Sequence, residues 1–321
     1  MGTWKRSSRY RTRSDGSGIH SLKPSSHGHT SGLFLLLIVV IIWGIAWPVQ
    51  KVILESLSPL WMVALRSIIS AAVLLPLMVI LERLRLPNRC DIPILLSISL
   101  LHMVGFATLT ALGLELVPAG RSVVLGYTVS LWLIPCAVLF LGEQFTARRA
   151  FGVSLGMTGL LVLFNPASFD WSDNDAVLGN FLILGGAILW AANILHLRGH
   201  HWRSTPFDLL LWETLLAGAI ILPVTLLIDG LPQADWNGEL IGLLLFSGVC
   251  AGALAFWAMA AAARSLPAMT TALGLLGVPM VGIVVATLAL SEPITPSLLV
   301  GVVLILSGVA TGITSSHVTD S

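Results

Sequence analysis

The sequence predicts an all-α integral membrane protein with ten transmembrane helices, arranged as two inverted repeats of five helices each. Three observations predict this fold: the apolar composition, a set of residues that occurs twice, and the placement of the basic residues. Of the 321 residues, 56% are hydrophobic and only 10% are charged, and the mean hydropathy is +0.91. Soluble domains carry about 25% charged residues, so this composition indicates a chain whose solvent is lipid.

A window of about 19 residues finds ten apolar segments that are long enough to cross a bilayer as helices. Their limits are 33–54, 59–80, 92–113, 118–141, 147–165, 177–197, 207–228, 239–262, 267–290 and 294–314. Several connections are only four or five residues long, which makes neighbouring helices antiparallel hairpins. Prolines stand near four predicted helix starts, where a missing N–H is tolerated; they are Pro59, Pro118, Pro206 and Pro267.

A set of residues occurs twice at a nearly constant spacing. With an offset of 147 residues, the first copy has Trp43, Ser58, Pro59 and Arg66 and the second has Trp190, Thr205, Pro206 and Glu213. With an offset of 149 residues, the first copy has Pro118-Ala119, Glu143, Thr146, Gly152 and Gly159 and the second has Pro267-Ala268, Glu292, Thr295, Gly301 and Gly308. Because five is an odd number, the second copy enters the membrane from the opposite side. Such repeats are typical of transporters, whose sites lie between the halves.

The basic residues set the orientation. If the N-terminus is cytoplasmic, fourteen of the seventeen Lys and Arg residues fall on the cytoplasmic side, as the positive-inside rule expects. We therefore predict a multi-pass protein of the cell (inner) membrane with both termini in the cytoplasm. Residues 1–32 are expected to form a disordered basic tail, 33–165 the first repeat, 177–314 the second repeat, and 315–321 a short tail. The expected partners are the lipid bilayer and a small-molecule substrate, and no nucleic acid. The protein is expected to be a monomer or a homodimer.

Several classes of site have no signal in the sequence. Cys90, Cys136 and Cys250 are scattered, without the spacing of a zinc site or a disulfide framework. We also find no phosphate-binding loop, no HExxH and no nucleophile elbow. The sequence therefore predicts no metal, no cofactor and no catalytic residue.

These features resemble the EamA family of the drug/metabolite transporter superfamily over residues 33–314. In the first repeat the resemblance is carried by Trp43-Gly44, Ser58-Pro59, Arg66, Pro118-Ala119, Leu141-Gly142-Glu143, Gly152 and Gly159. The second repeat keeps Pro267-Ala268, Glu292, Gly301 and Gly308, but Ala191 and Ser291 replace glycines of the first. The resemblance implies an exporter of small metabolites. It leaves the substrate open, because the family spans amino acids, nucleobases, sugars and other metabolites.

Three ionisable residues fall inside predicted spans, where such groups usually face a cavity or a partner. Arg66 could bind a substrate carboxylate in a forked geometry, or it could pair with an acidic neighbour as a structural lock. Glu213 could carry a proton during exchange, or it could reach the cytoplasmic edge of the membrane. His102 could relay a proton or bind substrate, or it could hydrogen-bond a neighbouring helix. Since Arg66 and Glu213 lie at opposite depths, we expect no salt bridge between them.

Aromatic and polar residues predict the rest of the binding site. Trp43, Trp47 and Gln50 share one face of the first helix, at the spacing i, i+4, i+7. The further candidates are Tyr127 and Ser130 in the fourth helix, Trp190 and Asn193 in the sixth, and Trp257 in the eighth. An aromatic pocket with a few polar groups suits a medium-sized, partly apolar metabolite. The alternative for these residues is packing between helices or contact with lipid.

We thus predict a transporter of small, amino-acid-like or drug-like metabolites that works by alternating access, in the efflux direction that the resemblance implies. The site is expected near the membrane midplane, and proton coupling through Glu213 or His102 is a further hypothesis. Two alternatives stay open: a passive facilitator or channel, and an integral-membrane enzyme acting on lipid-linked substrates. The enzyme would need several ionisable groups at one depth, whereas Arg66, His102 and Glu213 are predicted at different depths.

Overall fold

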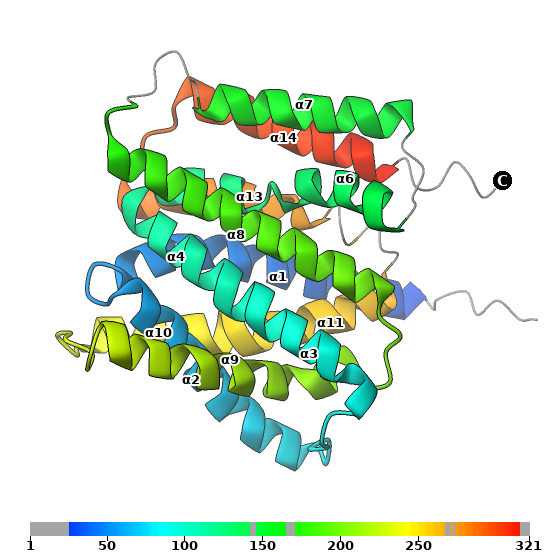
Figure 1. Cartoon of the computed structure of the whole chain (residues 1–321), viewed down its shortest axis with the longest axis vertical. Coiled ribbons are helices and arrows are strands. Elements are labelled where there is room, and N and C mark those ends of the chain that lie inside the picture. The colour runs from blue at the N-terminus through cyan, green and yellow to red at the C-terminus, as the bar shows by residue number, and fades with distance from the viewer. Residues whose placement is uncertain (1–25, 142–145, 165–170, 267–270, 272–273, 315–321) are drawn as a thin grey trace, which may run out of the picture.

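The computed structural model describes residues 26–141, 146–164, 171–266, 271 and 274–314, and this part of the chain contains helices and no β-strand (Figure 1). Its helices are α1 (Ser26–Ile53), α2 (Pro59–Ile80), η1 (Arg89–Asp91), α3 (Ile92–Ser97), η2 (Ile98–Phe106), α4 (Ala107–Leu116), α5 (Ala119–Gly126), α6 (Val129–Leu141), α7 (Ala147–Phe164), α8 (Asn174–Gly199), α9 (Pro206–Ile228), α10 (Gly238–Leu245), η3 (Phe246–Leu254), α11 (Ala255–Ser265), α13 (Gly277–Leu290) and α14 (Pro296–Thr314). Each of the ten predicted segments falls on one or more of these helices, which confirms the all-α class. The predicted tails lie mostly outside the described residues, and α1 begins at Ser26, earlier than predicted.

Six of the described helical stretches are long and apolar enough to cross a membrane, with mean hydropathies between 1.8 and 2.6. They are Thr30–Ile53, Pro59–Ile80, Arg89–Leu116, Asn174–Gly199, Pro206–Ile228 and Gly238–Met259. Shorter apolar helices accompany them at Ala150–Leu163, Gly277–Leu290 and Pro296–Thr311. Large apolar side chains cover the outer surface, such as Leu227 at 86% exposure and Ile80 at 76%. Contiguous exposure of this kind is unfavourable in water but not in lipid, so the chain is a multi-pass membrane protein.

Side-chain caps explain where several helices begin. Ser58 accepts a hydrogen bond from the N–H of Trp61 and caps α2, whose first residue is Pro59. Thr205 caps α9 in the same way, again just before a proline. These two caps are equivalent in the two halves, and they satisfy amides that have no partner within the helix.

The third and eighth predicted segments are continuous helical runs that change to π-helix in the middle. In the first half α3 leads through η2 into α4, and in the second half α10 leads through η3 into α11. Both π segments are nine residues long and start 148 residues apart, at Ile98 and Phe246, so they are equivalent in the two halves. π-helical turns inside α-helices are frequently found at functional sites.

The fourth predicted segment is two helices, which corrects the single helix expected over 118–141. α5 ends at Gly126 and α6 starts at Val129, with a turn between them. The hydroxyl and the N–H of Thr128 both donate to the carbonyl of Leu125, at 2.6 and 3.2 Å. A side chain that competes for a helical carbonyl in this way interrupts the regular pattern. The ninth segment has a turn at the equivalent residue, Leu276, directly before α13.

Helices of each half pack mainly against helices of the other half. α1 of the first half packs against α11 and α13 of the second, and α8 of the second half packs against α4 and α6 of the first. α2 packs on α9, and α7 on α14; the latter pair lies side by side in Figure 1. Exchanging every helix for its counterpart in the other half maps this set of contacts onto itself.

A buried carboxylate ties the start of the third segment to the connection between α8 and α9. Asp91 has an exposure of 0%. Its Oδ1 lies 2.9 Å from Nε2 of His200 and accepts a hydrogen bond from the N–H of Arg203 at 3.0 Å. Its Oδ2 accepts from the N–H of Ser204 at 2.7 Å. One side chain thus holds the whole loop between two long helices.

Glycines allow α4 and α8 to cross closely. A Cβ atom on Gly113 would lie 2.5 Å from Cγ1 of Ile183 and 2.6 Å from the carbonyl oxygen of Gly179. A Cβ atom on Gly179 would in turn lie 2.5 Å from Cγ2 of Val117. Small residues at such crossings are the usual means by which membrane helices approach one another.

Replacing Gly113 by alanine should therefore force the two helices apart and lower the free energy of unfolding by about 1–3 kcal/mol. The measurement is the thermal unfolding midpoint of the detergent-solubilised protein. Gly242→Ala is the matched control, because a Cβ atom there meets nothing within 4 Å. That variant should be neutral or stabilised by about 0.5–1 kcal/mol through helix propensity. Equal midpoints for the two variants would contradict a tight crossing.

Candidate functional site

A cavity of about 100 Å³ lies where the two halves meet. Its lining comes from α1 and α2, from both π segments, from the helices that follow them, from α8 and α9, and from the turn at Tyr127. The lining residues are Trp43, Ala46, Trp47, Gln50, Arg66, Ser67, Ser70, His102, Met103, Phe106, Thr110, Leu114, Tyr127, Trp190, Thr214, Ala251, Gly252 and Phe256.

Most of the residues that the sequence singles out are brought together here. Seven of the ten binding candidates line the cavity: Trp43, Trp47, Gln50, Arg66, His102, Tyr127 and Trp190. Ser130 falls in α6, and its side chain lies outside the described part of the structure. Asn193 is buried elsewhere and accepts a hydrogen bond from the hydroxyl of Ser97 at 3.2 Å, which joins α8 to α3.

Trp257 faces away from the cavity, with 39% of its surface exposed, and its neighbour Phe256 lines the cavity instead. The reason is helical geometry. Phe256 follows the lining residue Gly252 by four positions and so shares its face, whereas the next residue is turned by about 100°.

The aromatic residues form one connected wall. The rings of His102 and Trp190 are stacked, with centroids 5.2 Å apart and planes 9° from parallel. Phe106 and Tyr127 also contact Trp190, at centroid distances of 4.9 and 5.6 Å. Phe256 closes the wall between Trp43, at 5.3 Å, and His102, at 5.8 Å. Such edge and face contacts hold the rings in fixed orientations around the cavity.

The polar groups of the lining fall into two sets. The hydroxyls of Ser67, Ser70, Thr110 and Thr214 all donate to carbonyls of their own helices. The indole N–H of Trp43 likewise donates to the carbonyl of Ala251, in η3, at 3.2 Å. The polar hydrogens of these groups are therefore already bound to backbone carbonyls.

The second set has its donors available. Four side chains of the lining make no hydrogen bond to any described residue: Arg66, Gln50, His102 and Tyr127. Arg66 keeps its charge at every physiological pH and carries five N–H donors. A guanidinium inside a membrane-spanning helix, with no partner among the residues that the structure describes, is costly, and such groups mark binding sites.

Glu213 is buried, at 5% exposure, but its neighbour Thr214 lines the cavity and it does not. Its backbone carbonyl accepts a hydrogen bond from Ser99 in η2, at 3.2 Å. None of the ion pairs between described residues joins it to Arg66. The two proton-coupling candidates are therefore placed differently, since His102 faces the cavity and Glu213 lies behind its wall.

Phe106, Phe256, Ser67, Ser70, Thr110 and Thr214 line the cavity but were not predicted from the sequence. Part of the signal was present, because Phe106 follows His102 by four residues and Ser70 follows Arg66 by four residues. A spacing rule alone cannot separate such residues from those that pack between helices. The π segments also change the helical phase, and their positions could not be predicted from the composition.

A clamp of two charged side chains holds the turn between α4 and α5 at one end of the cavity. Glu292, in the connection between α13 and α14, accepts hydrogen bonds from the N–H groups of Ala119 and Gly120, at 2.6 and 2.8 Å. Lys51, at the end of α1, donates to the carbonyls of Leu114, Glu115 and Val117, at 2.6, 3.0 and 3.2 Å. The carboxylate thus caps the start of α5, and the ammonium caps the end of α4.

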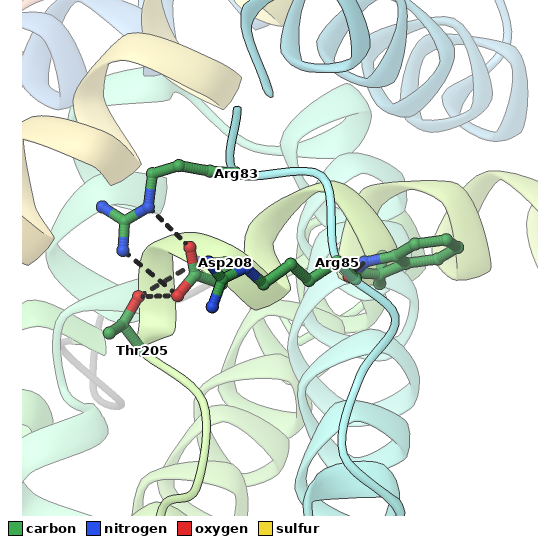
Figure 2. A network of polar contacts seen from close by, with 5 residues as sticks. Arg83, Arg85, Thr205 and Asp208 are labelled. Carbon is green, nitrogen blue, oxygen red and sulfur yellow. Dashed lines mark hydrogen bonds and ion pairs between the residues drawn. The ribbon is translucent and has the colours of Figure 1, made fainter. Parts of the chain in front are cut away.

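Polar contacts join the two ends of the α2–α9 pair. At one end, Asp208 forms a forked ion pair with Arg83, with an Nε–Oδ1 distance of 2.9 Å, and accepts from the hydroxyl of Thr205 at 2.6 Å (Figure 2). At the other end, the hydroxyl of Ser58 donates to Asp229. Since these contacts lie outside the lining of the cavity, they fix the pair of helices without contributing to the site.

Comparisons with known proteins agree with this architecture. The sequence profile of the EamA-like transporter family matches residues 30–165 and 177–313, once in each half. The chain is 24% identical to the "Uncharacterized transporter YoaV" of Bacillus subtilis, over 84% of this chain and 92% of that one. It is 27% identical to a "Probable amino-acid metabolite efflux pump" of Escherichia coli, over 85% of this chain and 92% of that one.

One solved crystal structure has the same fold. It covers 90% of this chain and 99% of its own, with a TM-score of 0.62 and 17% sequence identity. A likeness at this identity concerns the fold alone.

Proposed function

Because the chain belongs to the EamA-like transporter family, we propose that it carries small carboxylate-bearing metabolites across the cell membrane by alternating access between two inverted five-helix halves. Substrate binds in the central cavity, with its carboxylate on Arg66 and its apolar part against the aromatic wall. Both termini lie in the cytoplasm, and transport runs outward. The name of the Escherichia coli relative, "Probable amino-acid metabolite efflux pump", supports this direction.

The observation that carries the proposal is a guanidinium in a cavity between the two halves that has no hydrogen-bond or ion-pair partner among the described residues. Arg66 comes from α2, while Trp190 and Thr214 come from the second half. A ligand in this position contacts both halves at once, as expected for a carrier in which one half moves against the other around a fixed site. The packing between the halves is a second support. Each contact between a helix of one half and a helix of the other has an equivalent contact in the opposite sense, so the two repeats could exchange conformations during transport.

A counterflow experiment separates a carrier from a channel. Purified protein is reconstituted into liposomes loaded with unlabelled 3-phenylpropanoate or L-phenylalanine, and the same labelled compound is added outside. A carrier should accumulate label transiently above equilibrium, because exchange is faster than net movement. A channel should give simple equilibration without this overshoot. Chemical conversion of the compound, followed by mass spectrometry, would instead favour an enzyme.

Proton coupling through His102 or Glu213 is tested in the same liposomes with a pH gradient. We expect the gradient to drive accumulation of substrate. Glu213→Gln should remove most of this gradient-driven uptake while leaving counterflow exchange in place, because exchange needs no net proton movement. His102→Gln should lower both the gradient-driven uptake and the exchange, because His102 also lines the cavity. Uptake that is equal with and without the gradient, in the wild type and in both variants, would show that transport is uncoupled.

A further inference from the structure

We infer that the cavity is selective for an organic anion with an aromatic ring, a carboxylate without an amino group, over a zwitterionic amino acid. This inference rests on the proposed function and narrows it, because it concerns which carboxylate-bearing metabolite the same site accepts. It follows from the balance of charges, donors and ring faces in the lining.

The charge balance of the cavity is one-sided. Arg66 is the only Lys or Arg residue of the described lining, and no Asp or Glu residue accompanies it there. Glu213, which is close in sequence to the lining residue Thr214, contributes no surface to the cavity. A bound carboxylate would therefore complete an ion pair, whereas a bound ammonium group would find no opposite charge.

The donors point to the same ligand chemistry. Arg66, Gln50, His102 and Tyr127 can all donate hydrogen bonds into the cavity, and none of them is engaged by another described residue. The serine and threonine hydroxyls of the lining already donate to backbone carbonyls, as for Ser70 with the carbonyl of Arg66 at 2.8 Å. A ligand with two acceptor oxygens and few donors satisfies this arrangement, and a forked carboxylate–guanidinium pair is its strongest single contact.

The α-ammonium of an amino acid has no suitable place in this arrangement. The ring faces of Trp43 or Trp190 could attract a cation in principle. However, the ammonium is attached to the carbon next to the carboxylate, so it must lie beside the guanidinium of Arg66 whenever the carboxylate is bound. Two positive charges would then share a single carboxylate in a partly dehydrated cavity, which disfavours the zwitterion.

The rings define the shape of the remaining part of the ligand. Trp190 is covered by His102 on a nearly parallel plane and by Tyr127 edge-on, at an interplanar angle of 86°. The cavity volume of about 100 Å³ limits the ligand to a compact molecule. A flat apolar ring can exploit these faces more fully than a flexible chain of the same size.

Three probes that share a phenylethyl group test the inference: 3-phenylpropanoate, L-phenylalanine and 2-phenylethylamine. The first two differ only in the amino group, and the third has the amino group without the carboxylate. Dissociation constants are measured by isothermal titration calorimetry on the purified full-length protein in nanodiscs. We expect 3-phenylpropanoate to bind at least tenfold more tightly than L-phenylalanine, and 2-phenylethylamine not to bind. Equal or tighter binding of L-phenylalanine, or no binding of 3-phenylpropanoate, would overturn the inference.

Variants connect this preference to the guanidinium. Arg66→Gln should abolish the binding of 3-phenylpropanoate, and Arg66→Lys should weaken it while keeping the order of the three probes, because the charge remains and the fork is lost. Arg85→Gln is the matched control, since its side chain is exposed and lies outside the cavity lining. It should bind all three probes as the wild type does. If Arg66→Gln does not fold, the order of affinities in the wild type and in Arg66→Lys still decides.

Counterflow of the same probes distinguishes this inference from the proposed function. Exchange of L-phenylalanine in preference to 3-phenylpropanoate would reject the anion selectivity while leaving the carrier intact. Tight binding of 3-phenylpropanoate without exchange of any of the three probes would reject the carrier while leaving the selectivity of the site intact. Exchange of 3-phenylpropanoate in preference to the other two would support both.

Discussion

Asp91→Ala is expected to lower the free energy of unfolding by about 3–5 kcal/mol, because it removes the acceptor of three partly buried hydrogen bonds at once. The carboxylate accepts from His200, from the N–H of Arg203 and from the N–H of Ser204, at distances between 2.7 and 3.0 Å. In the variant the two backbone amides lose their acceptors. Since the loop they belong to connects α8 and α9, its release should also loosen the positions of both helices.

The measurement is thermal or denaturant unfolding of the purified protein, followed by tryptophan fluorescence. Asp235→Ala is the matched control, because Asp235 is an exposed acidic residue and should change stability by less than about 0.5 kcal/mol. Asp91→Asn provides an intermediate case. It keeps the shape and one acceptor oxygen, but it directs an NH₂ group toward a donor. A midpoint for Asp91→Ala within error of the control would contradict the structural role of this residue.

The helices themselves could be predicted well, because hydrophobic length in a membrane depends on composition more than on detailed packing. The predicted segment 59–80 coincides with α2, whose ends are set by the cap at Ser58 and by the polar residues that follow Ile80. The turn at Tyr127 and the two π segments could not be predicted. The turn is accompanied by a local hydrogen bond of Thr128, and neither the turn nor the π segments leave a periodic signal in the sequence.

The residues of the candidate site could likewise be predicted only in part. Arg66 and His102 could be singled out because an ionisable group in a span is rare and costly, whatever its neighbours. Trp257 was predicted to line the cavity, but it lies on the other face of its helix. The sequence could not separate the two positions, because tryptophans occur both in cavities and at lipid surfaces. Asn193 was selected for its polarity, but that polarity is satisfied within the protein by Ser97. Polarity thus indicates that a group needs a partner, and only the packing shows whether the partner is protein or ligand.

Opening of the clamp at Glu292 is the second change with a large expected effect. Its carboxylate accepts from the first amides of α5, at 2.6 and 2.8 Å, while Lys51 holds the last carbonyls of α4. Hydrogen bonds to a charged group contribute about 1.5–3 kcal/mol each. Leu114, whose carbonyl accepts from Lys51, also lines the cavity, so the clamp closes the structure directly beside the site. Glu292→Ala should therefore shift the protein toward a state in which this end of the cavity is open.

Accessibility of Gln50 measures this shift, because it lines the cavity and directly precedes Lys51. With the three native cysteines replaced, Gln50→Cys is labelled by a membrane-impermeant thiol reagent. We expect labelling at least tenfold faster in Glu292→Ala, since a loss of about 3 kcal/mol corresponds to a more than hundredfold change in population. Glu55→Ala, which removes an exposed charge nearby, is the matched control and should label as the parent does. If both variants accelerate labelling equally, the effect comes from charge rather than from the capped turn, and if neither does, the clamp does not close the cavity.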